Sequence, residues 1–353
     1  LEEDTKVLDE VVVVGYQEVR KKDLTGSVAK ADMKELLNTP VGSFDQTLGG
    51  RIAGVNVSSS EGTPGGTMNI VIRGNNSLTQ DNSPLYVIDG FPVEDASIAS
   101  TINPSDIESL DILKDASATA IYGARGANGV VIITTKKGKV GKPQLTYDGS
   151  VTMQHVTRTI PMMDAYEFVK LQAEMYPDAM TSSSGGYLMY NDGKQWTLED
   201  YRNIDQYNWQ DEIFQNASMH NHQINISGGN DNAKYSISGG YLKQEGIAIG
   251  SDFERFSARV NIDNKITKWL STGLRASVAK TMQRNTIDNG NIIRTAIQQF
   301  PDTPVRNPDG TWGAQETDNF GTHYMNPVAE ALLRENYDKG TQMYIDFFAD
   351  LTL

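Results

Sequence analysis

The chain has 353 residues, enough for two domains of ordinary size. Its 45 acidic and 31 basic residues give a formal net charge of −14, which argues against a nucleic-acid-binding protein, because such proteins present a basic face. The sequence contains no cysteine, which excludes disulfide bonds and thiolate metal sites.

No apolar run approaches the roughly 20 residues of a membrane-spanning helix. The chain therefore fits either a soluble protein or an outer-membrane barrel, whose strands alternate in polarity. The first ten residues, LEEDTKVLDE, lack the basic and apolar regions of a signal peptide, so we expect a mature, trimmed or partial chain. Residues 1–22 form a polar segment ahead of the first folded unit.

Four consecutive valines, Val11–Val14, interrupt this N-terminal segment. An extended strand of this kind exposes both of its edges, which suits pairing with the sheet of another protein. The alternative is an edge strand of the domain that follows. The position at the N-terminal end, ahead of that domain, favours pairing with a partner.

Residues 23–141 contain short strands and short helices in mixed order, the pattern of an α+β domain. We predict strands at residues 25–30, 55–59, 68–73, 85–88, 110–113 and 130–135. Helices or helical turns are predicted at residues 31–37, 44–48 and 116–122. Ser105 and Glu108 have capping-box spacing, which predicts one more short helix there, and Gly123 has the place of a C-cap glycine.

Three glycines in the sequence GARGANG, from Gly123 to Gly129, raise the possibility of a phosphate-binding loop. The pattern departs from G-x-G-x-x-G and precedes a strand instead of opening a helix. The Gly-Lys pair further on is followed by Val140, where a Walker loop needs serine or threonine. The sequence therefore predicts a tight packing corner here and no nucleotide site.

After residue 141 the polarity alternates in six runs, at residues 144–154, 222–227, 234–242, 255–262, 270–280 and 341–353. In the first run, for example, Leu145, Tyr147, Val151 and Met153 share one face of the predicted strand. The runs are 6 to 13 residues long, around the roughly 9–11 residues that cross an outer membrane at a tilt. These runs predict membrane-crossing strands.

Long and short connections alternate between these strands. Residues 155–219 and 281–340 form long loops, whereas the other connections are short turns. This asymmetry is typical of outer-membrane barrels, which have short periplasmic turns and long outer loops. A soluble β-sandwich is not expected to place all of its long loops at one end. Because six strands cannot close a barrel around a plug, we expect further strands beyond residue 353.

Residues 107–139, IESLDILKDASATAIYGARGANGVVIITTKKGK, closely resemble the signature of the SusC/RagA family of TonB-dependent outer-membrane transporters. LGGRIAGV, IRGNNSL and PLYVIDGFPV resemble the family's plug motifs and occur in family order, and DEVVVVGY resembles its TonB box. The resemblance implies an α+β plug domain (residues 23–141) followed by an antiparallel transmembrane β-barrel (residues 142–353), which has 22 strands in the family and is incomplete here. It also implies that TonB adds a strand to the TonB box, residues 9–16, through Asp9, Glu10, Val11, Val12, Val13, Val14 and Gly15.

The resemblance further implies a bacterial outer-membrane location, a surround of outer-membrane lipid, and a SusD-like surface lipoprotein that covers the barrel, with dimers of such pairs. The expected activity is TonB-dependent import of oligosaccharides. Two alternatives remain open: import of oligopeptides, as in the RagA branch, and surface binding without transport. We expect no enzymatic activity, no cofactor and no nucleic-acid partner.

Ligand binding is the chemistry that the polar and aromatic residues favour. Amides and hydroxyls suit hydrogen bonds to hydroxyl-rich ligands, and aromatic rings stack on sugars, although solvated loops and loop cores use the same residue types. The predicted ligand contacts are Asn75, Asn76, Thr79, Gln80, Asp81, Trp196 and Trp209.

Other candidate sites carry less weight. The sequence SVAK, at residues 27–30 and 277–280, matches the S-x-x-K of penicillin-binding enzymes, but serine and lysine three apart in a strand face opposite sides. His220 and His222 share a strand face without a third metal ligand. Arg73 and Asp89 lie in the plug motifs, and we expect structural salt bridges from them.

Overall fold

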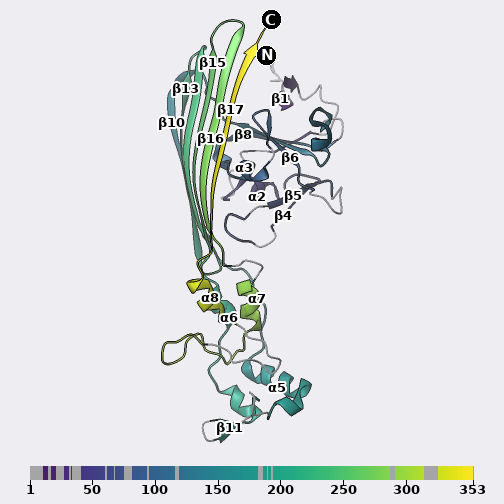
Figure 1. The fold of residues 1–353 in the computed structure, drawn as a ribbon, viewed down its shortest axis with the longest axis vertical. Helices are drawn as coiled ribbons and strands as arrows, with labels where there is room; N and C mark the ends of the chain where they lie inside the picture. The colour runs from purple at the N-terminus through teal and green to yellow at the C-terminus, as the bar shows by residue number, and fades with distance from the viewer. Residues whose placement is uncertain are drawn as a thin grey trace, which may run out of the picture.

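The structure is a computed structural model. It describes residues 11–14, 17–20, 28–31, 33, 41–59, 62–66, 68–74, 82–93, 95–115, 119–181, 186–188, 190–191, 194–286, 291–313 and 325–352. The described residues form three regions: a small α+β unit (the plug), a tall sheet beside it (the wall), and a group of helices beyond one end of the wall (Figure 1).

The plug is built around a five-stranded sheet. Strands β6 and β9 pair in parallel, and the other neighbours pair antiparallel. In sheet order the strands are β3 (Val28–Ala31), β8 (Ile107–Leu113), β9 (Val130–Thr135), β6 (Leu85–Ile88) and β7 (Phe91–Val93).

The uninterrupted apolar run of β9 reflects burial on both faces. Val131 and Ile133 enter the main core of the plug, whereas Val130 and Ile132 enter a smaller core on the opposite face of the sheet. A strand covered on both sides has no reason to alternate in polarity. The buried strand predicted at residues 130–135 is therefore confirmed.

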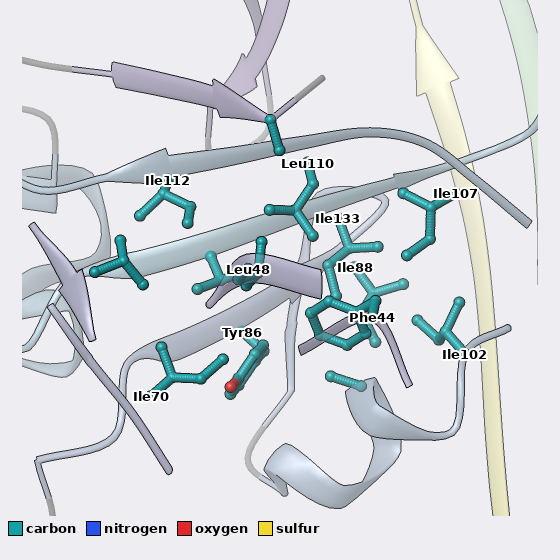
Figure 2. Packing of buried hydrophobic residues seen from close by; sticks show 14 of the residues in the cluster. Phe44, Leu48, Ile70, Tyr86, Ile88, Ile102, Ile107, Leu110, Ile112 and Ile133 are labelled. Atoms are coloured by element: carbon teal, nitrogen blue, oxygen red, sulfur yellow. The ribbon is translucent and has the colours of Figure 1, made fainter. Parts of the chain in front are cut away.

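The main core lies between the sheet, helix α2 (Phe44–Leu48) and the hairpin of β4 (Val55–Ser59) and β5 (Met68–Ile72). Figure 2 shows Phe44 and Leu48 of α2 among the labelled aliphatic side chains of the sheet. Phe44 meets Tyr86 edge to face, with ring centroids 6.4 Å apart. The predicted elements at residues 44–48, 55–59, 68–73 and 85–88 are all present, to within a residue.

The helix predicted from Ser105 and Glu108 is wrong. A single 3₁₀ turn, η2 (Pro104–Asp106), occupies this place, and its N-cap is Asn103, whose side chain accepts a hydrogen bond from the Ser105 N–H at 3.0 Å. Glu108 already belongs to β8, because Ile107 and Leu110 enter the core and hold the chain in the sheet. Tertiary burial overrides the local capping signal here.

The glycine-rich corner contains two 3₁₀ turns, joined within η3 (Ala120–Gly126) by Gly123, which has φ 60° and ψ −146°. Gly123 thus ends a helical turn, as predicted, although residues 116–118 of the predicted helix lie outside the described residues. Most of the helix predicted at residues 31–37 also lies outside them. Helix α3 (Ala96–Ser100) and strand β7 were not predicted.

The wall confirms all six predicted strands. They pair antiparallel with their neighbours in chain order and are 13 to 15 residues long. Their bounds are β10 (Gly141–Gln154), β13 (Ala217–Gly229), β14 (Ala233–Glu245), β15 (Asp252–Lys265), β16 (Leu270–Arg284) and β17 (Tyr337–Leu351). All six exceed their predicted length because the ladder of hydrogen bonds continues past the apolar stretch.

The two faces of the wall are reversed relative to a soluble sheet. Side chains on the outward face are apolar and exposed; Leu145 and Phe347, for example, are each 70% accessible. On the plug-facing side, polar residues such as Arg255, Asn261 and Gln223 are buried. The reversal is expected for a sheet whose outward face contacts lipid.

The connections of the wall alternate as predicted. Residues 230–232 and 266–269 make short turns at one end, and the two long loops leave the other end, together with residues 246–251. The long loops hold α5 (Ala165–Met175), η4 (Pro177–Ala179), β11 (Tyr190–Asn191), β12 (Lys194–Gln195), η5 (Leu198–Arg202), α6 (Trp209–Ile213), α7 (Asn291–Gln298) and α8 (Pro327–Leu333).

Candidate functional site

The plug-facing side of β15 carries a row of polar side chains that contact the plug. Arg255, Arg259 and Asn261 alternate with outward residues, so all three point to the same side. The Asn261 amide donates to Thr135 Oγ1 and to the Lys136 carbonyl, both at 2.9 Å. The Arg255 guanidinium donates to the Ser100 carbonyl at 3.2 Å. The wall thus binds the plug through directed hydrogen bonds.

Asp89 forms the buried ion pair between plug and wall. It follows β6 in a left-handed conformation, with φ 50°. Its carboxylate accepts from the Thr135 N–H at 2.7 Å and from Thr135 Oγ1 at 2.6 Å, and the Arg259 guanidinium lies 3.8 Å away. Both ion-pair side chains are almost inaccessible, at 2% for Asp89 and 6% for Arg259. The salt bridge expected of Asp89 is confirmed.

Arg73 also has a positive φ, but its side chain is more exposed to solvent than that of Asp89. It has φ 60° and pairs with Asp115 within the plug, where the two side chains are 51% and 28% accessible. The salt bridge expected of Arg73 is therefore also confirmed. Asp89 and Arg73 are the two non-glycine residues with positive φ among the residues that the structure describes.

A second polar contact joins η2 to β13. Gln223 of β13 donates to Asp106 Oδ1 at 2.8 Å and accepts from the Asn103 amide at 2.8 Å. Burial raises the pKa of Asp106 above its ordinary value, although hydrogen bonds from Ser238 and Gln223 and the charge of Arg259 oppose the shift. The contact therefore consists of hydrogen bonds between polar side chains of the plug and the wall.

A cleft of about 290 Å³ lies between the plug and the loop-proximal ends of β15, β16 and β17, and we call it the outer cleft. The carbonyl of Pro64 accepts from Gln283, and Gly65 has φ 69° with no room for a side chain beside the Phe253 ring. The lining residues are Gly42, Ser43, Gln46, Gly65, Gly66, Ser97, Ser100, Thr101, Phe253, Arg255, Thr281, Gln283, Asp338, Gly340 and Gln342.

Two polar atoms of the outer cleft have unused hydrogen-bonding capacity. Gln342 donates to Ser97 Oγ at 3.2 Å, but its Oε1 has no partner among the described residues. Arg255 Nη2 is also buried without an acceptor among the residues that the structure describes. Because buried polar atoms are normally paired, the side chains of Arg255 and Gln342 are the polar groups of this cleft whose bonding is least complete.

The predicted ligand contacts lie elsewhere or outside the described residues. Residues 75–81, with Asn75, Asn76, Thr79, Gln80 and Asp81, lie outside the described residues. Trp196 is half-buried in the outer loops, edge to face with Tyr201 at 5.2 Å.

Trp209 lies in the core of the outer-loop helices. It is 3% accessible, packs with Ile213 and Ile292, and donates its indole N–H to the Phe300 carbonyl at 3.1 Å. These contacts give Trp209 a packing role, which the sequence had left open beside ligand contact. A ligand reaches this ring only if the loop core opens.

The N-terminal valines form a strand, β1 (Val11–Val14), which pairs antiparallel with β2 (Gln17–Arg20). The register sets Val12 opposite Val19 and Val14 opposite Gln17. Within the described chain no third strand joins this pair, so one edge of β1 is open. Figure 1 shows β1 near the end of the wall opposite the helices. Asp9, Glu10 and Gly15 of the predicted TonB contact lie outside the described residues.

The weaker candidate sites do not assemble. Ser277 and Lys280 lie on opposite faces of β16, as the strand spacing requires. His220 and His222 stack on the outward face of β13, where His222 Nδ1 hydrogen-bonds the Tyr147 hydroxyl at 2.7 Å. Across the described ranges, no cluster of three or more His, Asp or Glu side chains could hold a metal ion. The same ranges contain no helix with the length and hydropathy needed to cross a bilayer.

Comparison with known proteins explains this arrangement. Residues 20–130 match the family described as "TonB-dependent Receptor Plug Domain". The TonB-dependent receptor SusC of Bacteroides thetaiotaomicron is 38% identical over 339 residues, covering 93% of this chain and 32% of that protein. TonB-dependent receptor P3 of Formosa agariphila is 38% identical over 358 residues, covering 99% of this chain and 33% of that protein.

Among solved structures, the RagAB peptide importer in its open-open state matches 98% of this chain and 41% of that chain, with a TM-score of 0.79 and 28% identity. The chain belongs to the SusC/RagA family of TonB-dependent receptors. It spans about a third of the length of the curated relatives cited above. The predicted fold class, a plug followed by barrel strands, is confirmed for this SusC/RagA-type receptor, and so is its outer-membrane location.

The sequence did not predict some residues of the plug–wall contact in this SusC/RagA-type receptor. Gln223, Asp106 and Arg259 are far apart in the sequence, and no short motif connects them. A signal was nevertheless present: Arg255 and Arg259 are four residues apart on the polar face of a predicted membrane strand, so both must point into the barrel. Such buried charges need partners, and a plug that fills the lumen supplies them.

Proposed function

We propose that this receptor imports oligosaccharides across the outer membrane, driven by TonB. In this scheme residues 1–22 carry the TonB-docking segment, residues 23–141 are the plug that closes the lumen, and residues 142–353 begin the barrel. The segment Asp9 to Gly15 pairs with TonB, whose pull releases the plug from the wall. A SusD-like lipoprotein covers the outer side, and such pairs associate as dimers.

One observation supports the glycan as substrate: the outer cleft is lined by neutral hydroxyl and amide side chains. Its ionisable lining residues are Arg255 and Asp338. A sugar hydroxyl both accepts and donates, so it can hydrogen-bond the hydroxyl and amide groups of this lining. Hydroxyl-rich ligands also match the Ser and Thr residues of α3 and its neighbours.

Oligopeptides are the second candidate, and the likeness to the RagAB peptide importer at 26–28% identity supports them. A peptide brings charged termini and backbone amides to the same cleft. Arg255 would then bind a carboxylate instead of a hydroxyl.

Binding of the two substrate classes to purified full-length receptor tests the choice. We expect defined oligosaccharides to bind and oligopeptide mixtures not to compete. Gln342→Met should weaken oligosaccharide binding about tenfold, because the cleft loses a hydrogen-bonding side chain. Gln154→Met, on the plug-facing side of β10 outside the cleft, is the matched control and should bind as wild type. Peptide binding that oligosaccharides do not displace would reverse the assignment.

A further inference from the structure

The outward face of the wall carries a groove of about 640 Å³ across β13 to β16, which we call the Gly239 groove. Gly239 pairs with Ile224 on one side and Ala258 on the other, and Ala258 pairs with Val278. A Cβ placed on Gly239 would meet nothing within 4 Å. Two adjacent positions with at most a methyl group therefore leave a dent between two β-branched side chains.

An aromatic pair closes one end of the Gly239 groove. Tyr241 and Phe256 are cross-strand neighbours with ring centroids 4.7 Å apart. In the same cross-strand row, His222 lies beside Tyr241, and Lys280 lies beside Phe256. All four side chains line the groove. A cation and an imidazole thus flank the aromatic end.

The row of the aromatic pair marks the border of the apolar band. On the side of the short turns, the next outward row is that of Gly239, and the row after it includes Ile226, Ile237 and Val260, which are all aliphatic. On the side of the long loops, they include Lys243 and Glu254. Aromatic residues of membrane barrels gather where hydrocarbon meets headgroups. The groove therefore lies at acyl-chain depth, and Lys280 lies at headgroup depth on the loop side.

The Lys280 ammonium group lies at this border without an ion-pair partner among the described residues. It is exposed, and within the described chain no carboxylate pairs with it. The nearest carboxylate along the neighbouring strand, Glu254, accepts a hydrogen bond from the Tyr241 hydroxyl at 2.7 Å. A lysine at this depth extends its stem along apolar surface and presents its ammonium group to an anion.

We propose that the Gly239 groove binds one phosphorylated glycolipid of the outer leaflet. One acyl chain fills the dent over Gly239 and Ala258, and a headgroup phosphate lies at Lys280 with His222 on the other side of the aromatic pair. A lipid phosphate fits this site better than a second receptor copy does, because the unpaired Lys280 at headgroup depth complements a negative charge. The site rests on four neighbouring strands of the wall and is independent of the imported substrate.

Native mass spectrometry of the full-length receptor in detergent tests the site, with bisphosphorylated lipid A and its dephosphorylated form as probes. We expect Gly239→Phe, which fills the dent, and Lys280→Gln, which removes the charge, each to weaken lipid A binding at least about tenfold. The controls are Ala349→Phe, outward on β17, and Lys268→Gln, in a turn at the other end of the wall. Both should bind as wild type.

The dephosphorylated probe separates a specific site from general lipid coating. Wild type should prefer the phosphorylated form, and Lys280→Gln should abolish that preference even if Gly239→Phe fails to fold. Equal binding of both probes to all variants would overturn the proposal in favour of an adventitious lipid. If Gly239→Phe leaves lipid A binding intact but converts a dimer to monomers, the occupant is a second copy and the proposal is wrong.

Discussion

The buried pair of Asp89 and Arg259 is the residue-scale contact that holds the plug against the wall. Replacing Asp89 with alanine leaves the Arg259 guanidinium buried without its carboxylate and the Thr135 N–H without its acceptor. Breaking a buried pair from one side costs about 3–5 kcal/mol. We therefore expect Asp89→Ala to lower the thermal unfolding midpoint and to raise the passive conductance of the full-length receptor in planar bilayers.

The open salt bridge of Arg73 provides the matched control. Since its side chain is half-exposed, Arg73→Gln should cost less than about 1 kcal/mol and leave conductance unchanged. If both variants leak equally, the plug is not held by the Asp89 contact. If neither leaks, other contacts suffice to seat it.

Asp106 gives the interface a pH dependence whose sign follows from burial. Its folded-state pKa is raised, so protonation favours the folded state; this stabilisation is complete below the unfolded pKa and is lost as pH rises through the folded pKa. Asp106→Asn cannot titrate. We expect the unfolding midpoint of wild type, measured relative to this variant, to rise as the pH falls from 7 toward 4. A difference that does not change with pH would contradict the assigned shift.

At the scale of elements, strand β1 should act through its backbone. TonB binding by strand addition uses main-chain hydrogen bonds, and proline removes one N–H and fixes φ. Val12→Pro should therefore abolish binding of the periplasmic domain of TonB to the full-length receptor, whereas Val12→Ile should preserve it. Isothermal titration of the two variants measures the difference.

Strand β2 offers the control for this prediction. Val19 lies opposite Val12 in the hairpin, so Val19→Pro disturbs the same pair of strands from the other side. If TonB adds to β1 itself, Val19→Pro should bind TonB at least as well as wild type. Equal loss in Val12→Pro and Val19→Pro would mean that TonB recognises the intact hairpin.

Trp209 distinguishes a loop core from a ligand contact. Replacing a buried tryptophan with alanine costs about 3–5 kcal/mol, so Trp209→Ala should make the long loops sensitive to limited proteolysis. Trp196→Ala, at a half-buried ring, should change proteolysis less. Loss of ligand binding in Trp209→Ala with unchanged protease resistance would restore the role predicted for it as a ligand contact.

The elements also differ in how far sequence alone predicts them. The wall strands were predictable because polar and apolar residues alternate along a strand that has one face toward lipid. Strand β9 was predictable because its run of valine and isoleucine is buried on both faces of the sheet. The turn at Pro104–Asp106 was not, since Ile107 and Leu110 enter the core and override a local capping signal. Short elements in the long loops, such as α6, gave no sequence periodicity long enough to recognise.

The residues of the candidate site also differ in how far the sequence predicts them. Asp89 and Arg73 were found from motifs, but the outer cleft was not, because Gln342 and Ser97 come together only in three dimensions. Nothing local to either residue marks the contact.

At the scale of the whole molecule, we propose that the plug, the wall and the N-terminal strand act together in transport. If TonB displaces the plug, as we propose, water can replace its polar contacts with the wall, whereas the apolar plug core would keep the unit folded. The outer cleft lies toward the long loops, and β1 lies near the opposite end. A ligand and TonB would thus act on the plug from opposite sides.

Uptake of labelled oligosaccharide by cells that carry the full-length receptor, with and without residues 9–15, tests this account most directly. We predict that the deletion abolishes uptake while surface binding persists, because the cleft is intact and only the energy supply is lost. Equal uptake by both strains would contradict TonB-driven import and leave a passive channel or a binding protein.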